Sequence, residues 1–232
     1  MLEIKKATEL TQSNATFLIY GNPGVGKTTA LKYLPGKTLV LDIDRSSTVL
    51  KGEENIDVVE IDAHNIWKEW LDTVAELINN QAAYAEYDNL VVDNVSELFR
   101  ASLANLGRDG KNRRVPEQSH YQQVDFTILD SLRGLQKLNK RLIFTAWETS
   151  DQWTTEGGQA FNRSMPDIRF KIFNNFIGLC DVVAQLVVSV DQKSDEVKRG
   201  YILQPTNSVF AKNRLDDRVG CKVEDLIVKE GE

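Results

Sequence analysis

The sequence predicts an α/β protein with a mostly parallel central sheet flanked by helices, and two observations lead to this prediction. Short runs rich in β-branched residues alternate with helical stretches along the 232 residues. A glycine-rich turn follows the first apolar run and opens the first helical stretch. Strands separated by helices form βαβ units, and the parallel sheets that they build are covered on both faces.

The expected elements follow in chain order. Strands are predicted at 15–21, 37–44, 56–62 and 141–147, and 89–99 turns from strand to helix. Helices are predicted at 27–34, 65–81 and 123–139; the second carries Ile66, Trp70, Val74 and Leu77 at three- and four-residue spacings. After position 180, "DVVAQLVVSV", "GYILQPT" and "SVFAKN" are three further strands, partly antiparallel. No element is assigned to 100–118 or 148–166, and loops of that length are often functional.

Composition limits the classes of protein that the chain can be. Its 41% hydrophobic and 27% charged residues are ordinary for a soluble globular protein. A net charge of −6 argues against non-specific nucleic-acid binding by the whole surface, so any such contact is local. No apolar run reaches the roughly 18 residues that span a bilayer, and the start lacks the apolar segment of a signal peptide. Two cysteines favour a reduced, cytoplasmic setting.

A phosphate-binding motif is the most specific signal in the chain. "GNPGVGKT" (21–28) fits G-x-x-x-x-G-K-[ST], between an apolar strand and a helix. In such a P-loop, backbone N–H groups and the helix N-terminus surround the phosphates of ATP. Lys27 would supply a cation to the outer phosphates, and the Thr28 hydroxyl would bind Mg²⁺. The expected nucleotide-binding residues are Gly21, Asn22, Pro23, Gly24, Val25, Gly26, Lys27, Thr28 and Thr29.

Two acidic residues are expected to complete this site. Asp93 ends the apolar run "NLVVD" and fits the Walker-B carboxylate that holds Mg²⁺ with Thr28; the alternative is a cap for the following helix. The next residue is Asn94 rather than Glu, so the base that activates water must come from elsewhere. Asp44, at the end of "TLVLDID", is the candidate, and Asp42 is its competitor on the same predicted face.

The order of these strands and motifs along the chain resembles that of the RecA-type ATPase core, over about residues 15–215. The whole chain, 1–232, is expected to form a single domain of this kind. Within that superfamily the opening "IYGNPGVGKTT" and the late "AKNR" look most like the phage nucleotide-binding proteins that include the Sak-type annealing family. The resemblance implies that Lys212 and Arg214 reach the ATP of an adjacent subunit. In a strand, side chains two residues apart share a face, so the two cations would point the same way. The alternative is that they are solvated cations that protect an edge strand from pairing with another strand.

The resemblance also places two DNA-facing loops in the unassigned segments. The first, "GRDGKNRR" (107–114), holds Arg108, Lys111, Arg113 and Arg114; the second contains Trp153, Phe161 and Arg163. Cations that follow phosphates and aromatic rings that stack on bases suit sequence-tolerant binding of single strands. The alternative is that a charge run is simply a solvated loop. "RLIFTAWE" (141–148) occupies the position of the strand that senses the γ-phosphate, at Trp147 or Glu148.

The function expected from these features is an ATP- and Mg²⁺-dependent single-stranded-DNA-binding recombination protein of phage type, which anneals or pairs strands in the bacterial cytoplasm. It would form a homo-oligomer, a ring or a filament, with ATP between subunits. A single-strand-binding protein is a further partner that this role implies. A helicase-type or loader motor is the second candidate, and a small nucleotide or metabolite kinase on the same P-loop is the third.

Overall fold

The computed structural model describes residue 6 and residues 15–112, 114–190 and 197–228. Its sheet has the strand order β10-β8-β7-β1-β5-β4-β2-β3, with β6 paired to β5 and β9 paired to β7. The strands of the parallel part are β1 (Thr16–Gly21), β2 (Thr38–Asp42), β3 (Ile56–Glu60), β4 (Asn89–Asp93), β5 (Arg141–Thr154) and β7 (Val182–Val190). Four strands run antiparallel to their neighbours: β6 (Ala160–Pro166), β8 (Val197–Ile202), β9 (Lys212–Asn213) and β10 (Gly220–Lys222). The predicted fold class is therefore confirmed.

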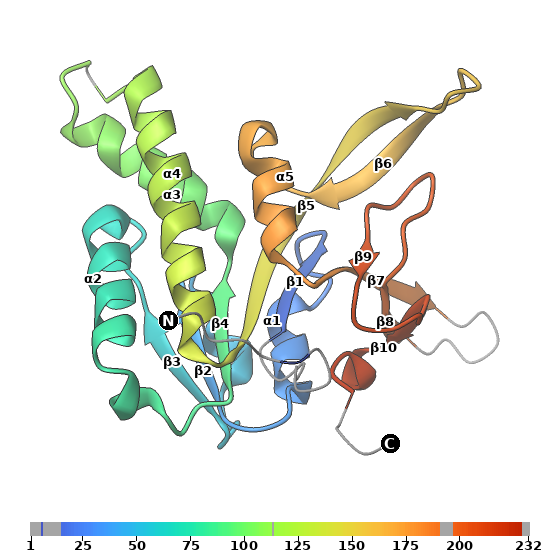
Figure 1. Cartoon of the computed structure of the whole chain (residues 1–232), viewed down its shortest axis with the longest axis horizontal. Helices are drawn as coiled ribbons and strands as arrows, with labels where there is room; N and C mark the ends of the chain where they lie inside the picture. Colours follow the sequence, from blue (N-terminus) through green and yellow to red (C-terminus); the bar gives the residue numbers. More distant parts are fainter. Residues whose placement is uncertain (1–5, 7–14, 113, 191–196, 229–232) are drawn as a thin grey trace.

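Helices cover the two faces of this sheet unequally (Figure 1). One face carries α2 (Ile66–Asn79), α3 (Val95–Asp109), α4 (Gln118–Leu135) and α5 (Phe170–Leu179). The other carries α1 (Lys27–Ala30), the 3₁₀ turn η2 (Leu31–Tyr33) and the C-terminal turn η6 (Val223–Asp225). The remaining 3₁₀ turns are η3 (Ser47–Leu50), η4 (Gln81–Tyr84) and η5 (Gln136–Leu138). None of the helices in these ranges has the length and apolar character needed to cross a bilayer.

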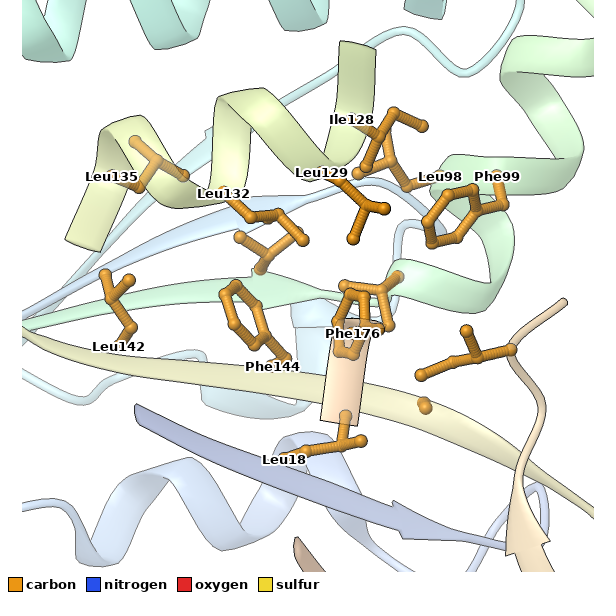
Figure 2. Packing of buried hydrophobic residues seen from close by; sticks show 14 of the residues in the cluster. Leu18, Leu98, Phe99, Ile128, Leu129, Leu132, Leu135, Leu142, Phe144 and Phe176 are labelled. Carbon is orange, nitrogen blue, oxygen red and sulfur yellow. The ribbon is translucent and has the colours of Figure 1, made fainter. Parts of the chain in front are cut away.

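Side-chain alternation along the buried strands builds one core on each face. On β1, Leu18 and Tyr20 enter the cluster under α2–α5, whereas Phe17 and Ile19 enter the opposite cluster. Figure 2 shows the first core, where side chains of α3, α4 and α5 meet those of β1 and β5. Phe176 of α5 lies at its centre and packs edge-on against Phe144, with ring centroids 5.5 Å apart. This core holds α3, α4 and α5 against one face of the sheet.

Strand order places the expected nucleotide residues at one sheet edge. β5 lies between the P-loop strand β1 and the Asp93 strand β4, and the register aligns Gly21 with Trp147. In the neighbouring pair of strands, β2 and β4, Asp42 lies beside Asp93. Ligands of open α/β sheets bind outside the carboxyl ends of such strands.

Three expectations about elements were wrong. Segment 148–166 is not a loop, because β5 continues to Thr154 and turns back as β6. The cross-strand pairs Trp153–Phe161 and Asp151–Arg163 fit this antiparallel ribbon, and Gly158 at φ 80° closes its turn. The helix after Asp93 continues to Asp109, and the next helix begins at Gln118. The expected strand "SVFAKN" contains only the two-residue β9.

Candidate nucleotide site

The P-loop adopts the backbone that a phosphate cradle needs. Gly24 and Gly26 have φ angles of 80° and 103°, a region that side chains other than glycine rarely adopt. Gly26 is the N-cap of α1, and its carbonyl accepts the N–H of Ala30 at 2.9 Å. The loop therefore turns directly into the first helical turn, and its residues line a cavity of about 310 Å³, as the N-terminus of a helix does in phosphate sites.

Lys27 lies at the floor of this cavity and is only 9% exposed. Its Nζ donates to the carbonyl of Gly21 at 2.8 Å and to that of Asn22 at 3.2 Å. Burial lowers the pKa of the Lys27 ammonium, and nearby carboxylates, Asp93 foremost, oppose that shift. These carboxylates favour the charged form that an anionic phosphate requires.

Four oxygen-bearing side chains converge beside Lys27. Oδ2 of Asp93 accepts from Oγ1 of Thr28 at 2.7 Å and from Oγ of Ser46 at 2.9 Å. The two hydroxyls lie 2.9 Å from each other, and the Thr145 hydroxyl donates to the other oxygen of Asp93. The two residues expected to hold a metal, Thr28 and Asp93, are therefore in direct contact.

The donors present fit Mg²⁺, which prefers oxygen ligands and binds proteins through one or two carboxylates. Asp93, Thr28 and Ser46 would hold the ion, since their oxygens lie within hydrogen-bond distance of one another at the cavity wall. When bound, the ion neutralises charge on the phosphates. Thr145 lies behind Asp93 and fixes the orientation of its carboxylate.

Asp44 and Asp42 have different roles. Both carboxylate oxygens of Asp42 accept backbone N–H groups, from Ser46 and Ser47 at 3.1 Å, so Asp42 holds the turn that presents Ser46. β2 ends at Asp42, so strand alternation no longer governs Asp44, which lines the phosphate cavity instead. Its Oδ1 is buried without a hydrogen-bond partner, and burial together with the charge of Asp93 raises its pKa. A carboxylate of this kind can accept a proton from water.

Asn94 connects the Asp93 strand to Asp44. Its Oδ1 accepts the N–H of Glu97 at 2.8 Å, which makes Asn94, and not Asp93, the N-cap of α3. The cap fixes which way the amide points, so its Nδ2 faces and donates to Oδ2 of Asp44. Asn94 is therefore a positioning residue for Asp44.

Comparison with known proteins places this site in a family. The family model described as "AAA domain" matches residues 13–215, which is most of the chain. The chain belongs to the AAA-domain family. A KaiC-like protein from the hyperthermophilic archaeon Pyrococcus horikoshii matches with 15% identity and a TM-score of 0.43, over 82% of this chain and 77% of that one. No curated protein sequence matches significantly.

The AAA-domain match and the P-loop geometry agree that this chain is a nucleotide-binding domain of the P-loop ATPase kind. Three residues of the site have no part in the motif by which it was found. Ser46 lies in a turn after β2, Thr145 lies inside β5, and Asn94 was noted only as a missing glutamate. Their roles depend on how β2, β4 and β5 align, which no short motif records.

The two positions considered for sensing the γ-phosphate lie at the end of the buried part of β5. Trp147 lines the phosphate cavity, and the guanidinium of Arg100 lies 4.9 Å from its ring centroid. Glu148 accepts from Nε2 of Gln185 at 3.2 Å and is one of the carboxylates that raise the pKa of Lys27. Trp147 therefore forms part of the cavity lining, whereas Glu148 acts on Lys27 through its charge.

Lys212 and Arg214 contact the C-terminal end of α5 in the same subunit. The Lys212 ammonium donates to the carbonyls of Ile177 and Cys180, at 2.9 and 2.6 Å. The Arg214 guanidinium also reaches the Cys180 carbonyl, at 3.0 Å, and pairs with Asp181 at 3.0 Å. The two side chains therefore meet at the Cys180 carbonyl, and both place a positive charge at the C-terminal end of α5, where the helix dipole favours it.

The residues expected to contact DNA are divided between two regions. Arg108 lies in the last turn of α3 and donates to the His64 carbonyl, Lys111 and Arg114 are exposed, and Arg113 lies outside the described residues. The other three residues share one face of the β5–β6 ribbon. The Trp153 and Phe161 rings lie 6.4 Å apart, and the Arg163 guanidinium lies 5.4 Å from the Trp153 centroid. In the view of Figure 1, the segments 110–112 and 114–117 lie on the opposite side of α5 from the tip of the β5–β6 ribbon.

Proposed function

We propose that this AAA-domain protein is an ATP- and Mg²⁺-dependent single-stranded-DNA-binding recombination protein, of the kind that phages use for annealing or strand pairing in the bacterial cytoplasm. The observation that carries the ATPase part is the cluster of Lys27, Thr28, Ser46 and Asp93 at one cavity, which Asp44 also lines. The DNA part is supported by the aromatic ribbon.

In this reaction each residue of the site has a separate task. Lys27 exchanges its bonds to the Gly21 and Asn22 carbonyls for the outer phosphates, where its charge offsets the charge that develops on transfer. Asp44, held by Asn94, accepts a proton from the attacking water. Asp93 is kept in its orientation by Thr145 and by the two hydroxyls.

ATP between subunits of a homo-oligomer, a ring or a filament, is part of the proposal, and contacts within the subunit refine it. The Lys212 ammonium is held by two carbonyls, whereas the Arg214 side chain is 52% exposed in its pair with Asp181. Arg214 is therefore better placed than Lys212 to reach the ATP of an adjacent subunit. Lys212 instead holds the C-terminal end of α5. An arginine supplied in trans is an efficient stabiliser of the transferring phosphate.

The ribbon favours stacking over phosphate contacts. Between 148 and 166 it carries three acidic residues and one arginine, Arg163, so its charge does not attract DNA. Trp153 and Phe161, paired across the strands, offer ring faces on which bases of any sequence can stack. Charge attraction would come from Lys111 and Arg114, with Arg108 and Arg113 next to them in the chain. A single-strand-binding protein is the further partner that this role implies.

The proposal is tested by ATP turnover with and without an unstructured oligonucleotide. We expect the oligonucleotide to stimulate turnover, with no phosphorylated small molecule and no strand separation. A phosphorylated acceptor would indicate the kinase, and ATP-driven unwinding would indicate the helicase-type motor. Turnover that an oligonucleotide leaves unchanged would contradict the DNA role.

Two variants separate the DNA elements. Trp153→Ala should weaken oligonucleotide binding by about 1–3 kcal/mol while leaving its salt dependence unchanged. Lys111→Glu with Arg114→Glu should instead reduce the salt slope, by about one for each phosphate that the variant no longer neutralises. Phe126→Ala is the matched control for the first variant, since Phe126 is an aromatic residue on α4 that is 75% exposed.

A further inference from the structure

A second cavity lies next to the phosphate cavity, and the two share Gly26 and Thr29. Its volume is about 180 Å³. Three segments distant in sequence form its walls: α1 with η2, strand β8, and the C-terminal turn η6. The lining residues are Gly26, Thr29, Ala30, Tyr33, Val197, Arg199, Val223 and Glu224.

This cavity lies where the P-loop would direct the rest of a nucleotide. Lys27 and Thr28 fix the outer phosphates, so the phosphate chain leaves the loop past the next residue, Thr29. Thr29, Ala30 and Tyr33 are spaced as neighbours on one face of the helical turn that follows. A nucleoside attached to that chain would lie on this face.

The lining combines apolar side chains with one charged group of each sign, Arg199 and Glu224. Tyr33 and Val197 are 55% and 54% exposed at the wall, while Ala30 and Val223 are buried beneath. An exposed tyrosine ring beside a cavity is a stacking surface for a flat base.

Arg199 and Glu224 supply the polar groups. The Arg199 Nε donates to the Val25 carbonyl at 3.1 Å, which holds the guanidinium against the P-loop where the two cavities meet. Its charge therefore lies beside the path of the phosphate chain. The Glu224 carboxylate, on the wall that η6 forms, can accept hydrogen bonds but not donate them, so it suits a base that carries an amino group.

We propose that this second cavity is the nucleoside-binding site, and that it binds the adenine base of the nucleotide whose phosphates occupy the P-loop. Tyr33 stacks on the base, Glu224 accepts from its amino group, and Arg199 lies along the sugar and inner phosphate. The inference rests on the proposed nucleotide-binding function and deepens it, because three residues outside the P-loop motif then determine affinity for the base.

The test compares ATP with tripolyphosphate, which lacks the nucleoside, by titration calorimetry. Tyr33→Ala should weaken ATP binding on the order of 5- to 100-fold, the range of one stacked base, and leave tripolyphosphate binding unchanged. Tyr33→Phe keeps the ring and should keep the affinity. The nucleoside site would be overturned if Tyr33→Ala bound ATP with wild-type affinity, or if its affinities for ATP and tripolyphosphate fell equally.

A second measurement tests the polar contact. Purine riboside triphosphate lacks the amino group of ATP, so wild-type protein should bind it more weakly, and Glu224→Ala should remove that difference. An unchanged preference in Glu224→Ala would overturn the role of Glu224. Failure of wild-type protein to bind either ATP or tripolyphosphate would overturn the proposed function itself, which separates the two ideas.

Discussion

Lys27 and Lys212 make the same kind of contact at two very different places. Each ammonium donates to two backbone carbonyls: Lys27 to Gly21 and Asn22, and Lys212 to Ile177 and Cys180. Burial lowers the pKa of both lysines. Carboxylates, Asp93 foremost, oppose that shift at Lys27, whereas the neighbouring Arg214 adds to it at Lys212.

The difference between the two lysines lies in what surrounds the carbonyls. Those around Lys27 belong to a glycine loop that borders a cavity of about 310 Å³. Those around Lys212 belong to the last turn of α5 and the residue after it. A lysine at a helix end satisfies carbonyls and interacts favourably with the helix dipole. The contacts of a cation therefore do not reveal its role, but the neighbouring cavity and acids do.

The largest effect expected from this comparison is at Lys27. Lys27→Ala removes the cation that faces the outer phosphates, and loss of one such donor costs on the order of 100- to 1000-fold in rate. Unfolding should change less than the two lost hydrogen bonds alone would suggest, because the variant also removes the cost of burying the ammonium. ATP turnover and thermal unfolding of the variant test both statements. Retention of wild-type turnover would show that the cavity is not the phosphate site.

Asn94→Ser sharpens the account of the acidic part of the site. Serine keeps an N-cap on α3 but lacks the amide that donates to Asp44. We expect ATP affinity to be unchanged and kcat to fall about tenfold, because a base held out of position transfers the proton less efficiently. Equal losses in affinity and kcat would indicate a purely structural role for Asn94.

At Lys212 we expect the main effect on stability and not on ATP turnover. Lys212→Ala removes two hydrogen bonds from a charged donor, to the Ile177 and Cys180 carbonyls, which should lower the free energy of unfolding by about 1.5–3 kcal/mol. Denaturant titration measures this loss, with Lys222→Ala as the control, since Lys222 is an exposed lysine on β10. Turnover per folded molecule should stay within a few-fold of wild type. A catalytic loss without destabilisation would reverse the comparison.

Arg214 tests the composite site, and its effect on stability is the smallest. Arg214→Ala removes a half-exposed ion pair with Asp181, so stability should change by less than about 1 kcal/mol. Turnover should fall, and mixing this variant with Lys27→Ala subunits should restore part of it, since the two defects then occupy different composite sites. Absence of recovery would leave Arg214 as a helix-end residue alone.

How far the sequence predicts this molecule depends on the range of each signal. The P-loop and Asp93 follow from local motifs, and the structure brings Thr28 and Asp93 together at 2.7 Å. Ser46 and Thr145 could not be assigned, because their contacts to Asp93 depend on strand order and register. The ribbon was missed because the polar and glycine residues around Gly158 hide the alternation of Trp153 and Phe161. The contact between Lys212 and α5 could not be predicted either, because it depends on the pairing of β9 with β7.

The central claim is that Asp44 is the base of a hydrolytic site on the P-loop, and Asp44→Asn tests it most directly. The change keeps the shape of the side chain and removes its ability to accept a proton. Asp62→Asn, the same change in a loop residue that accepts the N–H of His64, is the control. The measurement is ATP hydrolysis at saturating ATP, with binding followed in parallel. The account predicts retained ATP binding with hydrolysis lost, and unchanged turnover in Asp44→Asn would contradict it.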